Sequence, residues 1–285
     1  MLPERLPSLT LPTLGGKQLW ADLWVRSGWR IQRSLITGHH RLLGPRDLRF
    51  AAGSFAHCLE TFDRRSLPDP PAHAVLCLHG IFRSKDSFNP MARALEAAGY
   101  HAVTVNYPST RRPLAGHADQ ISTVLDGLPA TTTRVSFVTH SMGGMVARTL
   151  LAREGAPWRD RIALGRLLLI ATPNRGADIV PWLECLPALY HAAGPALREL
   201  HPARASAVPP PALPFATIAG VRGDPRGWNP LLPGDDDLTV AAASVRLDGA
   251  EDHLDVPALH TFIAADPRVI RAAIHYLATG SLRVR

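Results

Sequence analysis

Between residues 74 and 277, short apolar segments alternate with segments whose apolar residues recur at helical spacing. The segments that we predict as strands cover residues 74–78, 101–107, 135–138, 167–170, 214–221 and, more weakly, 253–256. Predicted helices cover residues 84–98, 113–128, 141–153 and 267–277. Continuous apolar strands separated by amphipathic helices are typical of a parallel sheet covered on both faces. The chain therefore belongs to the α/β class, where ligand chemistry gathers at the carboxyl ends of the strands.

One strand-to-helix junction in this pattern carries a serine. Residues 134–144 read Arg-Val-Ser-Phe-Val-Thr-His-Ser-Met-Gly-Gly, so an apolar run meets Ser141 in a tight turn before a helical run. Such a turn is a nucleophile elbow: it lifts the serine to the end of the sheet, and Gly143 lacks the Cβ that a sharp turn excludes. The helix that follows places backbone N–H groups beside the hydroxyl. This junction predicts a nucleophilic serine.

A serine hydroxyl becomes a good nucleophile only when a base takes its proton, and the base needs a carboxylate partner. In elbow enzymes of this class the order along the chain is serine, acid, histidine. His260 follows the last predicted strand and precedes the closing helix, which is where such a base belongs. His253 is the alternative, although it begins that strand and so falls on the opposite side of the sheet.

The acid is expected on the loop after the strand at 214–221. This loop contains Asp224 and then the triplet Asp235, Asp236 and Asp237. We favour Asp237, because it stands directly before an apolar step into the next segment, where an orienting carboxylate is held. Asp236 stays open as an alternative, followed by Asp224 and Asp235.

Two backbone N–H groups are needed to stabilise the negative charge that develops on an attacked carbonyl. One comes from Met142, directly after the serine. The loop after the first strand reads Leu-His-Gly-Ile-Phe over residues 78–82, and Gly80 permits close backbone approach. We expect the second N–H from Ile81, with Phe82 as the alternative. His79 in this loop is interpreted as shaping it rather than as a base.

Five motifs resemble those of the α/β-hydrolase superfamily, in particular its bacterial lipases and esterases. Leu-His-Gly at 78–80 resembles the oxyanion loop, and Val-Thr-His-Ser-Met-Gly-Gly at 138–144 resembles the nucleophile elbow. Residues 171–176 look like the TPNxG turn, 237–240 are similar to the DG-x-V acid motif, and 260–262 are similar to the histidine loop. The resemblance implies an α/β-hydrolase fold, with a mostly parallel central sheet, helices on both faces and a lid-like insertion at 175–213.

The chain departs from the family pattern at three places. Thr139 stands where the elbow usually has its first glycine, and Leu238 stands where a glycine usually follows the acid. Residues 1–70 carry no family motif. They are expected to form an N-terminal lead, with antiparallel edge strands within 28–51 and a short helix at 54–65, in one domain with the core at 71–285. Residues 1–18 are expected to be irregular.

The resemblance implies a serine hydrolase that cleaves carboxylic esters through an acyl-enzyme on Ser141, without metal or organic cofactor. Acyl transfer, or hydrolysis of thioesters or amides, would use the same residues, and a non-catalytic binding protein is a third reading. The insertion at 175–213 is apolar and favours apolar acyl chains, with Phe82 and Trp182 as substrate contacts. It forms either a lid or a capping pair of helices.

The composition narrows the choice of partners. The net charge is +7, but the 31 Lys and Arg residues are scattered, without the basic run and interleaved aromatics of a nucleic-acid binder. Three cysteines at wide spacing match neither a disulfide framework nor a zinc motif. The N-terminus lacks the features of a signal peptide, and no apolar run approaches the ~20 residues of a membrane span. We expect a cytoplasmic protein that acts on a small-molecule or lipid ester, with contact to a lipid interface as an option.

Overall fold

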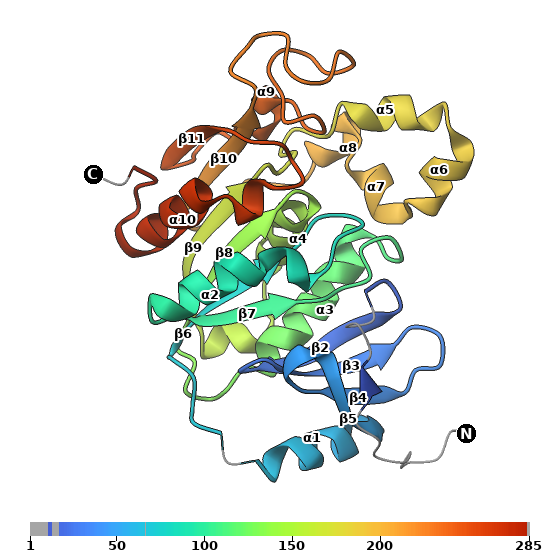
Figure 1. The fold of residues 1–285 in the computed structure, drawn as a ribbon, viewed down its shortest axis with the longest axis vertical. Coiled ribbons are helices and arrows are strands. Elements are labelled where there is room, and N and C mark those ends of the chain that lie inside the picture. The colour runs from blue at the N-terminus through green and yellow to red at the C-terminus, as the bar shows by residue number, and fades with distance from the viewer. Residues whose placement is uncertain (1–10, 13–16, 66, 284–285) are drawn as a thin grey trace.

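A six-stranded parallel sheet forms the centre of the protein (Figure 1) in a computed structural model that describes residues 11–12, 17–65 and 67–283. Its strands are β6 (His73–Leu78), β7 (His101–Val105), β8 (Arg134–His140), β9 (Ala163–Ile170), β10 (Phe215–Val221) and β11 (Asp252–Pro257). They lie in the order β11-β10-β9-β8-β6-β7, and every neighbouring pair is parallel. Each predicted strand is present, and the α/β fold is confirmed.

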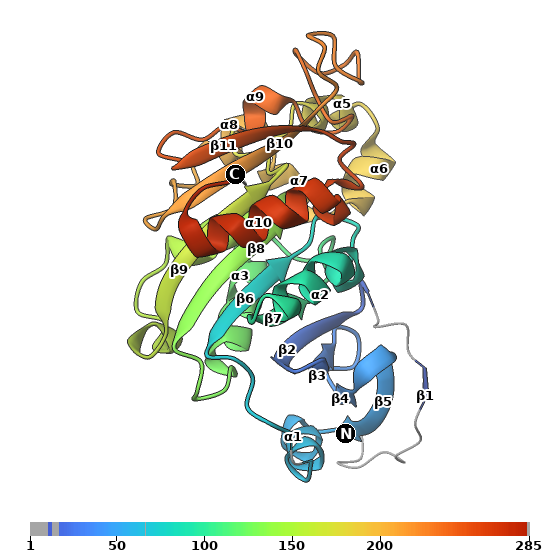
Figure 2. The same cartoon turned by 60° about the vertical axis from the view of Figure 1, so that its left-hand side comes forward.

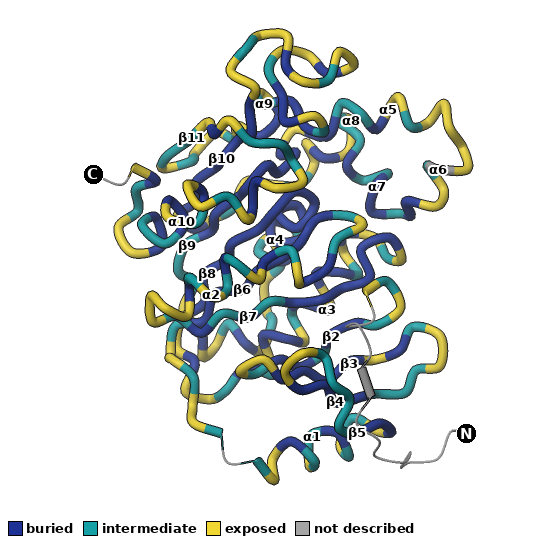
Figure 3. The backbone as a smooth tube through the Cα atoms, in the orientation of Figure 1, coloured by how far each residue is buried: buried dark blue, intermediate teal, exposed yellow. Residues whose placement is uncertain are grey.

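Helices cover both faces of this sheet, as the alternating pattern predicted (Figure 2). On one face lie α3 (Leu114–Asp126) and α4 (Met142–Leu151), and on the other lie α2 (Asn89–Ala97) and α10 (Pro267–Thr279). Neighbouring residues of one strand pack on opposite faces of the sheet. Leu76 belongs to the apolar cluster with α3 and α4, and Val75 belongs to the cluster with α2 and α10. The inner strands β6, β8 and β10 are therefore buried almost throughout, whereas β11 at the edge is mostly intermediate or exposed (Figure 3).

The predicted helix at 84–98 is divided in the structure. A 3-10 turn covers Lys85–Phe88, and the α-helix begins only at Asn89. Pro90 lies in the first turn of α2, where its missing N–H is harmless, whereas in the interior of a longer helix it would remove a hydrogen bond. Gly99, at φ +86°, follows the end of this helix as expected.

The N-terminal strands form a sheet of their own, which corrects the expectation of edge strands. This antiparallel sheet has the order β1-β5-β4-β3-β2 and pairs with no strand of the parallel sheet among the described residues. Its members are β1 (Leu11–Pro12), β2 (Trp20–Arg26), β3 (Trp29–Ser34), β4 (His40–Leu43) and β5 (Leu48–Gly53). The helix α1 (Phe55–Asp63) covers one face, and Trp24, Ile31, Leu42 and Phe62 pack into a separate apolar core. The strands bury their apolar side chains there, so they need no place in the central sheet.

Two further segments lie beyond the carboxyl ends of the strands. The insertion at 175–213 contains four short helices rather than one pair: α5 (Ile179–Glu184), α6 (Pro187–Ala192), α7 (Pro195–Glu199) and α8 (Pro202–Ala205). The loop after β10 leads to a short helix, α9 (Ala242–Val245). The predicted irregular lead at 1–18 falls mostly outside the described residues. Within the described ranges, no helix is both long and apolar enough to cross a membrane.

The order of the strands decides where a ligand can be approached. β6 is the first strand of the sheet along the chain, and it lies between β7 and β8. The next strand, β7, is added on one side of β6, and the later strands are added on the other side. Leu78 at the end of β6 is level with Thr139 near the end of β8. Crevices at such reversal points are the usual ligand sites of parallel sheets. The serine turn and the Gly80 loop therefore lie side by side.

Candidate active site

The serine turn has the backbone of a nucleophile elbow. Ser141 follows β8 directly and has φ +56° and ψ −130°, a conformation that is costly for a residue with a Cβ. Its N–H donates to the carbonyl of Ile170 at 2.9 Å, and its carbonyl accepts from Gly144 at 3.0 Å. The turn is thus tied both to the neighbouring strand β9 and to the first turn of α4.

Close packing explains the two glycines after the serine. A Cβ on Gly143 would lie 2.2 Å from the carbonyl oxygen of Leu78, which is backbone of β6 and cannot move aside. A Cβ on Gly144 would lie 2.1 Å from Oγ1 of Thr172. Thr139, in place of the usual first glycine, is accommodated because its hydroxyl donates to the carbonyl of Leu168 at 3.0 Å. The elbow therefore tolerates this departure from the family pattern.

The serine, histidine and aspartate singled out in the sequence lie within hydrogen-bonding distance of one another. His260 Nε2 is 3.0 Å from Ser141 Oγ, and His260 Nδ1 is 2.6 Å from Asp237 Oδ2. The N–H of His260 also donates to the carbonyl of Asp237 at 2.9 Å. His253 lies elsewhere: its ring contacts Thr217 and Asp255, near the start of β11. The geometry therefore favours His260 over His253.

The acidic residues of the loop after β10 have separate partners. Asp237 Oδ1 accepts from the N–H groups of Thr239 and Val240 at 3.0 and 2.8 Å, which leaves Oδ2 for the histidine. Asp236 accepts from backbone N–H groups on both sides of its loop, those of Asn229 and Leu238. Asp235 and Asp224 also accept backbone N–H groups of this loop. Only Asp237 among these four carboxylates is placed to orient His260.

The expected oxyanion donors differ in what they already bind. Among the described residues, the N–H groups of Ile81 and Met142 donate no hydrogen bond. The N–H of Phe82, in contrast, donates to Ser109 Oγ at 3.1 Å. Free donors beside the serine are available to a negatively charged oxygen. The geometry therefore favours the pair Ile81 and Met142.

Two buried histidines support the turns around the serine. His79 is stacked on Tyr107 with ring centroids 4.1 Å apart, and its Nδ1 donates to the carbonyl of Gly80 at 2.8 Å. Burial lowers the pKa of His79 to about 4, so the ring is neutral at pH 7. His140 Nε2 donates to the carbonyl of His260 at 3.0 Å, and burial lowers the pKa of His140 well below its usual value. His79 thus shapes its loop, as expected.

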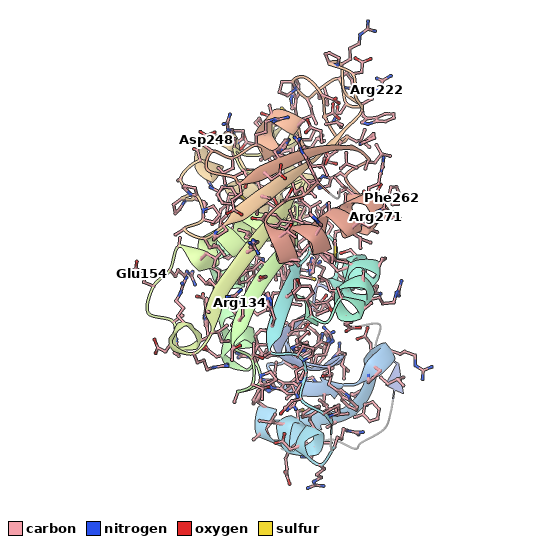
Figure 4. The ribbon with its side chains drawn as sticks, turned by 90° about the vertical axis from the view of Figure 1, so that its left-hand side faces the viewer. Arg134, Glu154, Arg222, Asp248, Phe262 and Arg271 are labelled. Carbon is pink, nitrogen blue, oxygen red and sulfur yellow. The ribbon has the colours of Figure 1, made fainter. Side chains whose placement is uncertain are left out.

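A pocket of about 330 Å³ opens beside Ser141 and His260. Its lining also includes Ile81, Phe82, Arg83, His140, Thr239 and Thr261. Phe82 is 58% exposed, and Phe262, 65% exposed, projects from the surface on the histidine loop (Figure 4). Trp182 on α5 is 54% exposed but does not line this pocket. Of the two expected substrate contacts, Phe82 lines the pocket beside Ser141 and Trp182 does not.

Sequence reasoning did not find three residues that lie at or near this site. His140 borders the pocket, and its place directly before the serine was the available clue. Arg83 donates from its guanidinium to the carbonyl of Thr261 at 2.9 Å, which joins the Gly80 loop to the histidine loop. Arg148 on α4 is buried and donates to the carbonyls of Asn174 and Val208, at the two ends of the insertion. Contacts over such separations leave no local pattern in a sequence.

Among the residues that the structure describes, no group of three or more His, Cys, Asp or Glu side chains is arranged to hold a metal ion. Burial raises the pKa of Cys58 to about 12, and Cys77 is buried inside β6. These two thiols are therefore protonated core residues. Cys185, in contrast, is exposed.

Comparisons with known proteins agree with the α/β fold described above. The family model described as "Alpha/beta hydrolase family" matches residues 75–282. The mature lipase BlEst2 of Bacillus licheniformis has 18% identity and a TM-score of 0.55, over 70% of this chain and 89% of its own. Its propeptide form gives 18% and 0.59, over 77% and 52%. Phospholipase PlaB from Legionella pneumophila gives 13% and 0.51, over 75% and 60%. At these identities the structural likeness establishes the fold alone.

A search of curated protein sequences gave no significant match. The match of the family model spans the serine, the histidine and the aspartate described above, and it begins inside β6. The antiparallel N-terminal sheet thus lies outside the matched region.

Proposed function

Because the chain belongs to the alpha/beta hydrolase family, we propose that it is a serine hydrolase that cleaves carboxylic esters through an acyl-enzyme on Ser141. The observation that carries this proposal is the continuous hydrogen-bonded path from Asp237 through His260 to Ser141. Nucleophile, base and orienting acid are the three groups that acyl transfer through a serine requires.

In this proposal, the hydrogen-bonded path gives the direction of proton transfer. Asp237 Oδ2 accepts Nδ1–H of His260, so the unprotonated Nε2 faces the hydroxyl of Ser141. As Ser141 Oγ attacks the ester carbonyl, its proton moves to Nε2, and Asp237 stabilises the imidazolium. His260 then donates this proton to the departing alkoxide. A water molecule, deprotonated by His260, later attacks the acyl-enzyme and releases the acid.

The oxyanion is stabilised by backbone. The N–H groups of Ile81 and Met142 donate to the oxygen that becomes negatively charged in the tetrahedral intermediate. Loss of one such donor typically costs about 10²- to 10³-fold in kcat. The dipole of α4, which begins at Met142, adds a favourable positive potential at the same place.

The aromatic side chains at and near the pocket favour a substrate with an apolar acyl chain. Phe82 contributes to its lining, and Phe262 stands exposed two residues beyond His260. Proteins named as a lipase and a phospholipase are among those that share the fold, which is in keeping with such a substrate. We propose an esterase or lipase-like enzyme, with Phe82 as a substrate contact.

The decisive experiment replaces the nucleophile. Ser141→Ala should abolish hydrolysis of p-nitrophenyl acetate and butyrate, because no other hydroxyl is hydrogen-bonded to His260 Nε2 among the described residues. A fluorophosphonate should label the wild-type protein at Ser141 and leave the variant unlabelled. Ser136→Ala is a suitable control, since this buried serine of β8 lies near the opposite end of the sheet. Equal turnover by wild type and Ser141→Ala would refute the proposal.

A further inference from the structure

The loop that carries the expected oxyanion donor covers residues 79–84 and is called the oxyanion loop below. It is held in an unusual conformation. Phe82 has φ +58°, a left-handed value that a residue with a Cβ adopts at a cost. Its N–H points to Ser109 and donates to Ser109 Oγ at 3.1 Å. This bond fixes the orientation of the peptide after Ile81, and it withdraws the N–H of Phe82 from the serine. The N–H of Ile81 is left as the free donor of the loop.

Ser109 is fully buried on the loop that follows β7, 27 residues beyond Phe82. Its hydroxyl oxygen accepts a second hydrogen bond, from Gln18 Nε2 at 3.0 Å. Two donors on one oxygen restrict the position of the hydroxyl more than one donor would. The geometry of the oxyanion loop thus depends on a side chain from the N-terminal part of the chain.

Gln18 is itself held from several sides. Its Oε1 accepts from the N–H of Thr110 at 3.1 Å and from the hydroxyl of Thr110 at 3.0 Å. These two donors assign Oε1 and Nε2, because only an oxygen accepts a backbone N–H. Nε2 also lies 3.4 Å from the carbonyl of Arg83, on the oxyanion loop. One amide therefore joins the loop after β6 to the loop after β7.

The antiparallel sheet holds the backbone near Gln18 in place. Gln18 comes two residues before β2, and Asp22 on β2 is fully buried. Asp22 exchanges hydrogen bonds with the backbone of Asn106: the N–H of Asn106 donates to its carboxylate at 2.7 Å, and its own N–H donates to the carbonyl of Asn106 at 3.0 Å. Arg30 pairs with the same carboxylate at 2.6 Å. The N-terminal sheet is thus locked to the loop that carries Ser109.

A second tie joins this sheet to the end of the oxyanion loop. Lys85 directly follows the oxyanion loop and is buried. Its Nζ lies 2.9 Å from the carboxylate of Asp47, in the turn between β4 and β5. The oxyanion loop is therefore connected to the N-terminal sheet on both sides of Arg83.

From these contacts we propose that Gln18 and Ser109 are positioning residues of the oxyanion hole, through which the N-terminal antiparallel sheet takes part in the reaction. The inference rests on the proposed function. It also gives a role to a region that the family match does not cover, because Gln18 precedes residue 75. Neither side chain contacts the reacting atoms. Both act by holding the Phe82 peptide, and so the Ile81 N–H, in place.

A loosened oxyanion donor affects mainly the transition state, where the negative charge develops. Loss of Ser109 Oγ should therefore lower kcat and leave KM nearly unchanged. We expect about a 10-fold to 100-fold decrease in kcat for Ser109→Ala, at or below the effect of removing a donor outright. Gln18→Ala should lower kcat by a smaller factor, because Ser109 still holds Phe82. Ser109→Thr keeps the hydroxyl and should recover part of the lost kcat.

Ser136→Ala is the matched control. Ser136 is also buried, and its hydroxyl accepts a backbone N–H, that of Arg166, at 3.0 Å and contacts one side-chain nitrogen, His73 Nε2, at 2.9 Å. Its removal should lower the melting temperature as much as Ser109→Ala does, without the change in kcat. Each variant is compared in kcat and KM for p-nitrophenyl butyrate, in the rate of fluorophosphonate labelling, and in thermal unfolding.

The outcomes separate this inference from the proposed function. If wild-type protein hydrolyses the ester and is labelled at Ser141, the proposed function stands. The inference is then supported by a selective decrease in kcat and labelling rate for Ser109→Ala. It is overturned if Ser109→Ala matches Ser136→Ala in kcat, or if KM alone changes. Wild-type protein that neither turns over esters nor reacts with the probe would overturn both.

Discussion

Among the turns at the active site that place a non-glycine residue at a left-handed φ, the elbow turn and the acid turn do so for different reasons. In the elbow turn this residue is Ser141, at +56°, and in the acid turn, which covers residues 236–240, it is Leu238, at +86°. The elbow turn is enclosed by the backbone of β6 and β9. In the acid turn, Leu238 is 50% exposed, and its N–H and carbonyl are bound to the side chains of Asp236 and Asn229.

The difference between the two turns indicates which backbone strain can be removed by substitution without loss of the site. The conformation of Ser141 is imposed by tertiary packing on two strands, and it presents the hydroxyl to His260. That of Leu238 is imposed locally, by hydrogen bonds within one loop, although the family pattern has a glycine there. Strain at functional sites persists where the surroundings over-determine it. The elbow should therefore be intolerant of substitution, whereas the acid turn should tolerate changes that spare Asp237.

The largest effect within the acid turn is expected for Asp237→Asn. An amide at this position can no longer accept Nδ1–H of His260 in the same way, so the unprotonated nitrogen no longer faces Ser141. We expect kcat to fall by roughly 10³- to 10⁴-fold, as for the equivalent change in other serine triads. Steady-state hydrolysis of p-nitrophenyl butyrate measures this loss.

Asp236→Asn is the control for that variant. Its carboxylate binds the N–H groups of Asn229 and Leu238, not the histidine. We expect a loss of stability of about 1–3 kcal/mol from the weakened backbone contacts, with kcat within tenfold of wild type. A larger loss of kcat from Asp236→Asn than from Asp237→Asn would reverse the assignment of the acid.

Gly143→Ala tests the packing of the elbow turn. The new Cβ would meet the carbonyl of Leu78 at 2.2 Å, so β6 and α4 must separate. We expect a loss of about 3 kcal/mol in the free energy of unfolding, at the upper end for overpacking. Urea denaturation measures this free energy.

Gly155→Ala provides the comparison for the elbow variant. Gly155, at φ +74°, has open space where a Cβ would stand, so only the backbone penalty of about 1–2 kcal/mol applies. If both glycine variants lost the same stability, crowding by β6 would not explain the elbow.

The smallest effect is expected for Leu238→Gly. Glycine removes a penalty of about 1–2 kcal/mol for the left-handed conformation and adds about 0.5–1 kcal/mol of entropy cost in folding. Since Leu238 is half exposed, little burial is lost, and the variant should be more stable than wild type by up to about 1 kcal/mol. Chemical denaturation detects a shift of this size. A clear destabilisation would show that the leucine side chain contributes packing that offsets its strain.

Most strands of the central sheet were predictable because they contain a short apolar run bounded by turn residues, whereas the mixed sequence of β11 gave only a weak prediction. Ser141 and Gly143 were recognisable from a contiguous motif, and His260 from its place after the last strand. The antiparallel sheet was misplaced, because alternation in strands such as residues 29–34 predicts pairing but does not name the partner strand. The start of α2 was predicted five residues too early, because Ser84 also fits an N-cap upstream of Pro90, whose place in a first turn marks the actual start.

By itself, the sequence determined the class of the fold, the serine turn and the set of acids and bases from which a site could be built. These features are local, since periodicity and turn chemistry act over a few neighbouring residues. The sequence also favoured Asp237 over Asp236 and Ile81 over Phe82. Only the tertiary structure gave the hydrogen bonds that separate them, and it alone brought Gln18 to Ser109. Each of these depends on residues that are apart along the chain. The distance between Asp237 and His260 is set by the pairing of β10 with β11, and that between Gln18 and Ser109 by how the two sheets pack.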